Sequence, residues 1–164
     1  MTDQSRRQIE VEERDALPLL DIFFAFGAML PLVLGAMVAW WASTGPWFLM
    51  ALQFVILWGS AILIFLSGVR RGLSFRTEGG PKWLQLATML ALYGLGVSAL
   101  AADWLNALIA ALVFLLVGYT VILVLDPIAA RRGEAPLYFG HLRRLQIPIA
   151  LLALTISLVI AARA

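Results

Sequence analysis

Five long apolar stretches dominate this chain and limit what it can fold into. Each is about twenty residues long, the length that a helix needs to cross the hydrocarbon core of a bilayer. None of them alternates an apolar face with a charged face at helical spacing, as a helix on the surface of a soluble protein would. We therefore predict an all-α, polytopic membrane protein with a polar segment at 1–16 and five transmembrane helices in a compact bundle, at about 17–41, 47–69, 83–102, 104–125 and 145–162.

The composition excludes several other classes of protein. Of the 164 residues, 62% are hydrophobic and 13% are charged, whereas a soluble domain has about a quarter charged residues. The chain has no cysteine, which excludes disulfides and thiolate metal sites. The net charge of +2 is too small to indicate a nucleic-acid partner. A transmembrane barrel is disfavoured because it needs many short alternating segments.

The connections between the stretches are of two kinds. Two are short, and the second of them contains Asp103. The other two, at 70–81 and 126–144, are long, polar and charged. We expect both long connections to lie outside the membrane and place Asp103 and Asp126 at its interface.

The basic residues predict an orientation. Eleven of the twelve Lys and Arg residues fall in the amino-terminal segment or in and beside the two long connections, which leaves Arg163 for the opposite face. Basic residues near span ends stay on the cytoplasmic side during insertion. We therefore expect a cytoplasmic amino terminus and an external carboxyl terminus. The preference for Arg over Lys suggests a GC-rich bacterial genome, so we expect the inner membrane of a bacterium.

Small residues at helical spacing predict where the spans pack, because helices in lipid associate through close backbone approach and hydrogen bonds. Pro31 predicts a kink in the first span. We expect buried faces on three spans, at Gly27, Gly35 and Ala39 in the first, Ala87, Ala91, Gly94, Ser98 and Ala102 in the third, and Ala150, Ala153, Ser157 and Ala161 in the fifth.

The second span carries a polar stripe. Gln53, Ser60 and Ser67 recur every seven residues, with Gly59 and Gly68 close to them, so all five lie near one helix face. One interpretation is a seam of hydrogen bonds between helices. The other is the wall of a polar cavity or of a lipid-headgroup site.

A second candidate site lies at the cytoplasmic face. Basic side chains there could meet anionic lipid headgroups or a protein partner, namely Arg70, Arg71, Arg131, Arg132, His141, Arg143 and Arg144. His141 is the single histidine, which argues against a bis-histidine haem or a histidine-rich zinc site. No phosphate-binding glycine loop, HExxH helix or GxSxG turn occurs. We predict no catalytic residue, cofactor or metal.

Residues 58–72, WGSAILIFLSGVRRG, resemble the signature YGAxILSFLGGxxWG of a known family. A second similarity lies at 136–148, where Pro-Leu-Tyr is followed by Leu-Arg-Arg-Leu-Gln-Ile-Pro. The chain is thus similar to the family called domain of unknown function 3429, the transmembrane protein 69-like proteins. The resemblance implies a small polytopic protein of bacterial inner membranes or mitochondria, without an established activity. The chain departs from the signature, which has Tyr, Ser, Gly and Trp at the positions of Trp58, Ile64, Ser67 and Arg71.

Three functions are compatible with this sequence. The first is a non-catalytic accessory or assembly subunit of a larger membrane complex, which would bind other membrane subunits or further copies of itself. The second is a small oligomeric transporter or channel that uses the polar stripe of the second span. The third is an enzyme that acts on a lipid or a quinone at the arginine-rich face.

Overall fold

In a computed structural model, residues 19–42, 44–75, 82–132 and 137–164 are described. The predicted polar segment at 1–16 and the side chain of His141 lie outside the described residues. The described residues fold into helices in the order α1 (Leu19–Gly27), α2 (Leu30–Ala42), α3 (Pro46–Ser74), α4 (Trp83–Trp104), α5 (Leu108–Arg131) and α6 (Leu137–Ala161).

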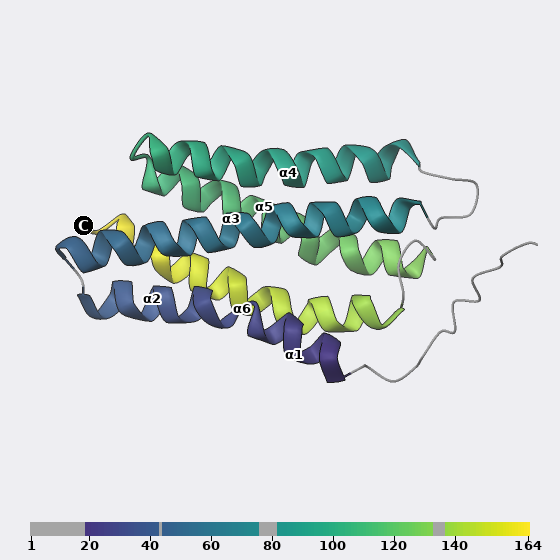
Figure 1. The fold of residues 1–164 in the computed structure, drawn as a ribbon, viewed down its shortest axis with the longest axis horizontal. Coiled ribbons are helices and arrows are strands. Elements are labelled where there is room, and N and C mark those ends of the chain that lie inside the picture. The colour runs from purple at the N-terminus through teal and green to yellow at the C-terminus, as the bar shows by residue number, and fades with distance from the viewer. Residues whose placement is uncertain (1–18, 43, 76–81, 133–136) are drawn as a thin grey trace, which may run out of the picture.

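The predicted fold class is confirmed. Five helical segments are long and apolar enough to cross a membrane, at Ile22–Ala42, Pro46–Ser74, Trp83–Trp104, Leu108–Arg131 and Leu142–Ala161. They lie side by side in one bundle (Figure 1). The first segment combines most of α1 with α2, so six helices make five spans. The chain is a multi-pass membrane protein.

Helix α3 lies at the centre of the bundle. It contacts α2, α4, α5 and α6, and it has the largest buried share of the five spans. Tyr119 of α5 is fully buried against it and donates its hydroxyl proton to the Gly59 carbonyl over 3.1 Å. A phenol needs such a partner in a dry interior, so this bond fixes how α5 faces α3.

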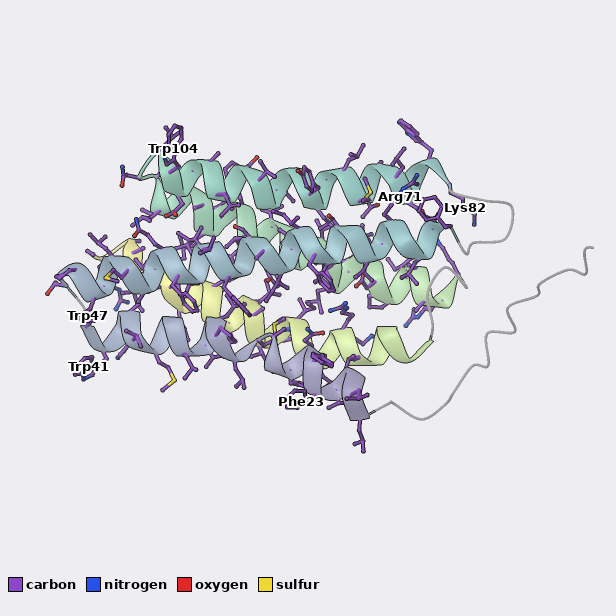
Figure 2. All side chains as sticks on the ribbon, in the orientation of Figure 1. Phe23, Trp41, Trp47, Arg71, Lys82 and Trp104 are labelled. Carbon is purple, nitrogen blue, oxygen red and sulfur yellow. The ribbon has the colours of Figure 1, made fainter. Side chains whose placement is uncertain are left out.

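The two ends of the bundle differ in chemistry. Arg71 and Lys82 lie at the end where α3 finishes and α4 begins, whereas Trp41, Trp47 and Trp104 lie at the other (Figure 2). Because α5 finishes and α6 begins beside the former (Figure 1), we call it the basic end; its described basic residues are Arg70, Arg71, Lys82, Arg131, Arg132, Arg143 and Arg144. Indole rings favour the headgroup level of a membrane, in agreement with spans that end there.

Several helices continue into the segments expected to be connections. Helix α3 continues past Arg70 to Ser74, α5 continues past Asp126 to Arg131, and α4 includes Asp103 in its last turn. Arginine favours helix almost as much as leucine does, and its long side chain reaches an interface from within a helix. Charged residues therefore mark the end of the apolar stretch but not the end of the helix.

The first span is broken just before Pro31, near the kink that the proline predicts. Helix α1 ends at Gly27 and α2 begins at Leu30. At the break the Met29 amide donates to the Phe26 carbonyl, three residues back, over 3.0 Å. In a regular helix this amide would donate four residues back, to the Ala25 carbonyl, which therefore lacks its usual donor. The Trp58 indole of α3 donates to the nearby Ala28 carbonyl over 2.9 Å. This hydrogen bond holds the break against α3.

Glycines set the closest contacts between helices. A Cβ atom added at Gly96 of α4 would lie 2.7 Å from Ile64 Cγ1 of α3, which no packed structure tolerates without a shift. One added at Gly35 of α2 would collide with Val55 in the same way, whereas one added at Gly94 meets nothing within 4 Å. The expected row at Gly94 and Ser98 is therefore not the packed face of α4.

The packed face of α4 includes Thr88, Leu92, Gly96, Ala99 and Ala102. Of the residues expected to be buried in this helix, Ala102 is buried, Ala87 and Ser98 are half-buried, and Ala91 and Gly94 are exposed. In α6 the expected face is packed, since Ala150, Ala153 and Ser157 are buried and Ala161 is half-buried. Both faces of α4 carry small residues, so spacing alone does not select one of them. The close approach of α3 and α4 at Gly96 makes the selection.

The two glycines of α4 provide a matched test of this packing. We expect Gly96→Leu to destabilise the bundle by about 1–3 kcal/mol, the usual cost of overpacking, and Gly94→Leu to leave it unchanged or slightly more stable. Both substitutions raise helix propensity equally, so the difference reports packing. Unfolding in mixed detergent micelles measures it, and equal effects of the two variants would contradict this face of α4.

Candidate functional site

An aspartate shared by two arginines lies at the basic end of the bundle. Arg70 of α3 donates to Asp126 Oδ1 of α5 through Nη2 and, over 3.0 Å, through Nε. Arg143 of α6 places its Nε 3.3 Å from the other carboxylate oxygen, Oδ2. The side chains of Arg70 and Asp126 are only 15% and 13% exposed. One carboxylate thus binds three helices together in a partly dry environment, where ion pairs are stronger than in water.

Gln146 connects this ion cluster to the broken first span. Arg143 donates through Nη1 to Gln146 Oε1 over 2.9 Å, and Gln146 donates through Nε2 to the Ala25 carbonyl over 2.9 Å. The Ala25 carbonyl is the one that loses its regular donor at the break. A continuous set of polar contacts therefore runs from α3 through α5 and α6 to α1.

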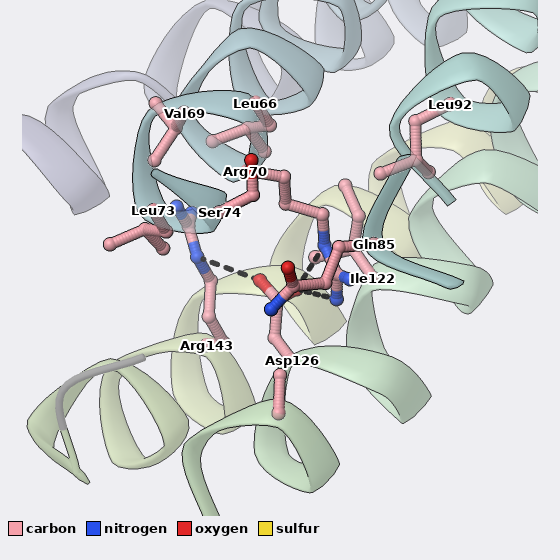
Figure 3. A pocket seen from close by; sticks show the side chains of 11 residues that line it. Leu66, Val69, Arg70, Leu73, Ser74, Gln85, Leu92, Ile122, Asp126 and Arg143 are labelled. Atoms are coloured by element: carbon pink, nitrogen blue, oxygen red, sulfur yellow. Dashed lines mark hydrogen bonds and ion pairs between the residues drawn. The ribbon is translucent and has the colours of Figure 1, made fainter. Parts of the chain in front are cut away.

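A small hollow lies against the ion cluster (Figure 3). Its volume is about 30 Å³, and its polar wall consists of Arg70, Ser74, Gln85, Asp126 and Arg143. A water molecule needs about 10–15 Å³ of such space and two or more polar partners. The hollow therefore suits water or a compact polar group, and is too small for the body of an organic substrate.

A second hollow, of about 50 Å³, adjoins the first where Arg70 and Gln85 form part of both walls. It lies between α4 and α5 and is also lined by Thr88 and Arg132. Its apolar wall includes Leu84, which is 62% exposed on the outside of the bundle. This hollow therefore extends to the surface that faces lipid.

A third hollow is far larger and almost entirely apolar. It measures about 650 Å³ and lies between α2 and α6. Ala36 and Ala153 form its buried floor, and Met37, Trp40 and Leu152 are exposed beside it. We call it the α2–α6 groove; its remaining residues are Val33, Trp41, Ile149 and Ile156.

The polar stripe of the second span is split between the core and the surface. Ser60 and Ser67 are buried, whereas Gln53 and Gly68 are exposed. Ser67 donates to the Ile64 carbonyl one turn back over 2.6 Å; among the described residues, no hydrogen-bond partner reaches the Ser60 hydroxyl. Neither serine lines any of the three hollows.

Gly59, the remaining member of the stripe, packs against α5. It is buried, and a Cβ atom added to it would lie 3.0 Å from Leu115 Cδ1. Its carbonyl accepts the Tyr119 hydroxyl. These contacts are those of a packed seam between two helices.

The predicted basic face divides into inward and outward side chains. Arg70 and Arg143 come together on Asp126, while Arg71 lies over the Phe75 ring, 4.3 Å from its centre. Three more arginines of this face are exposed, Arg131 and Arg132 at the end of α5 and Arg144 in α6. Asp126 and Gln146 belong to the site although no sequence pattern marks them as site residues. The one local signal is that Asp126 directly follows the fourth apolar stretch and precedes Pro127.

Comparison of the chain with protein-family models, with curated proteins and with solved structures gives no match. The resemblance to the domain of unknown function 3429 family therefore stays a prediction. The site has to be interpreted from its own geometry. Among the described residues, no group of three or more His, Cys, Asp or Glu side chains could hold a metal ion.

The shared carboxylate can be tested by removing its charge alone. We expect Asp126→Asn to destabilise the bundle by about 3 kcal/mol, because it leaves two confined guanidinium groups without their counter-charge. Asp103→Asn removes the same charge where no described residue forms an ion pair with it. We expect this control to leave the bundle unchanged or slightly more stable, because Asp103 Oδ1 is buried without a hydrogen-bond partner among the described residues and loses a desolvation cost with its charge. Unfolding in mixed micelles measures both. A stability loss as large in the control as in Asp126→Asn would contradict the role of the cluster.

Proposed function

We propose that this protein is a non-catalytic accessory or assembly subunit of a larger membrane complex. The observation that carries the proposal is the α2–α6 groove. It is the largest of the three hollows in the described bundle, and its lining is almost entirely apolar, with the indole N–H groups of Trp40 and Trp41 as its side-chain donors. Such a groove can pack against another apolar surface, and it provides few polar groups that could orient or activate a substrate.

The dimensions of the groove favour a transmembrane helix as the occupant. Helices in lipid pack where small residues allow close approach, and Ala36 and Ala153 form such a floor. Met37, Trp40 and Leu152 form exposed walls on both sides. A helix with one bulky apolar ridge would fill this shape, and that helix could belong to another subunit or to a second copy of the chain.

The polar hollows support the same conclusion by their size. At about 30 and 50 Å³, they are much smaller than the 300–1,000 Å³ of ordinary ligand pockets. The transport alternative depends on Ser60 and Ser67, both of which are buried away from these hollows. An accessory role needs neither a substrate pocket nor a polar path.

The proposal includes a location and an orientation. Seven of the eight described basic residues lie at the basic end of the bundle, and Arg163 alone follows the opposite end of α6. Positively charged span ends are retained on the cytoplasmic side. We place the basic end in the cytoplasm and the protein in a bacterial inner membrane. The amino terminus is then cytoplasmic.

Cysteine labelling tests this orientation without background, because the chain has no cysteine of its own. We expect a membrane-impermeant maleimide added to intact spheroplasts to label Thr44→Cys, at the end opposite the arginines. Phe75→Cys, at the basic end, should react only after permeabilisation. The reverse pattern would contradict the orientation.

Photo-crosslinking tests the partner. A benzoylphenylalanine at Met37 in the α2–α6 groove should give a discrete crosslinked protein in living cells, identified by mass spectrometry. The same probe at Val97 of α4, which is also exposed to lipid, is the control and should give none. A product with twice the mass of the 18.0 kDa chain would identify a second copy as the occupant. Crosslinking to lipid alone at Met37 would overturn the proposal.

A further inference from the structure

The hollow between α4 and α5 combines two cationic side chains with an opening toward lipid. Arg70, which is half-buried, and Arg132, which is exposed, both line it, together with the polar side chains of Gln85 and Thr88. Guanidinium groups recognise oxyanions because their N–H groups match the spacing of carboxylate or phosphate oxygens. The polar part of this hollow therefore has the chemistry of an oxyanion site.

The rest of the same hollow is apolar and faces outward. Leu84 and Ile128 are 62% and 38% exposed on adjacent helices, and Leu125 lies with them on the wall. In a bilayer this surface is covered by acyl chains. A ligand that fits both parts has a negative head and an apolar tail on the same molecule.

The charges around the hollow leave a positive excess. Asp126 is the one acidic side chain on the walls of the two adjoining hollows, and it is shared between Arg70 and Arg143. With Arg132, three guanidinium groups thus face one carboxylate in this part of the described structure. An added anion would reduce this excess in a region of low dielectric constant.

We propose that this hollow is a specific binding site for the phosphate group of an anionic phospholipid. Arg70 and Arg132 are its ligands, and the acyl chains of the lipid pack on the α4–α5 surface. Basic pockets between transmembrane helices are known to bind anionic headgroups in this manner. The inference does not depend on the accessory role, because it concerns another face of the bundle. Of the residues in the predicted basic face, the proposal assigns headgroup binding to Arg70 and Arg132 alone.

The two arginine pairs of the chain provide internal controls. In the pair Arg70–Arg71, only Arg70 lines the hollow, while Arg71 lies over Phe75. In the pair Arg131–Arg132, both side chains are exposed but only Arg132 lines the hollow. Removing either member of a pair changes the net charge equally, so a difference between them reports the site and not the overall charge.

The experiment is a titration of the purified full-length protein in detergent, followed by native mass spectrometry. Dioleoylphosphatidylglycerol is the anionic probe, and dioleoylphosphatidylcholine is the neutral one. We expect Arg132→Ala to weaken binding of the anionic lipid about fivefold, the effect of one basic residue near an anionic surface. Arg131→Ala should weaken it less than twofold, and neither variant should change binding of the neutral lipid. Arg132→Lys should restore part of the affinity.

Three outcomes would overturn the proposal. Equal losses in Arg131→Ala and Arg132→Ala would mean that the anionic lipid responds to diffuse charge. No loss in Arg132→Ala would mean that the hollow does not hold the headgroup. Inorganic phosphate that displaces the anionic lipid at low millimolar concentration would identify a free oxyanion as the ligand instead of a lipid. Failure of phosphate to compete, together with the selective loss in Arg132→Ala, would support the lipid.

Discussion

The hydrocarbon core of a membrane provides no hydrogen-bond partner, so each polar group that enters it must be satisfied by the protein itself. The broken first span shows how this chain meets that requirement. Where the regular ladder fails before Pro31, the Ala25 and Ala28 carbonyls accept hydrogen bonds from Gln146 and Trp58. Two side chains from α6 and α3 thus replace part of what the helix lost. The break is stable because the bundle around it is in place, and α1 cannot be treated as an independent element.

The same requirement explains the composition of the ion cluster. Gln146 uses its amide hydrogen for the break and its carbonyl oxygen for Arg143, and Arg143 in turn faces Asp126. An arginine that is only 6% exposed would be costly in a membrane protein without such partners. The cluster therefore fixes the relative positions of α3, α5 and α6 at one end, while Tyr119 and the glycine contacts fix the apolar middle. Specific polar contacts and close packing act at different depths of the same bundle.

The sequence predicts the spans well because their signal is local. Length and apolar composition identify all five without any knowledge of what each helix contacts, and Pro31 indicates the break. The ends of the helices are harder to predict, because Arg70 and Asp126 fit a helix as well as a loop. The expectation that Gly94 is packed fails for a related reason: Gly94 and Gly96 are equally small, and only the position of α3 decides which of them is packed.

The ion cluster was beyond prediction for a different reason. Arg70 and Asp126 are separated by 56 positions, and Gln146 and Ala25 by 121, so no spacing rule relates them. Their sequence neighbours are consistent with solvent-exposed span ends, and the arginines alone suggest a surface for headgroups. The sequence does contain one indication of a pairing: an acid at the end of an apolar span, such as Asp126, is costly unless a cation pairs with it. That rule predicts the need for a partner but does not identify Arg70 or Arg143.

The bundle has two kinds of surface in different places, a polar cluster at the basic end and an apolar groove between α2 and α6. The polar contacts are concentrated at the basic end on α3, α5 and α6, whereas the α2–α6 groove has an apolar lining and includes Trp40 and Trp41 from the opposite end. Only α6 contributes to both, through Arg143 at one end and Ile156 at the other. A helix in the groove would contact both α6 and α2. Helix α2 is joined through the break to α1, whose Ala25 carbonyl accepts the hydrogen bond from Gln146. The groove and the ion cluster therefore share one helix, α6, even though their chemistries are separate.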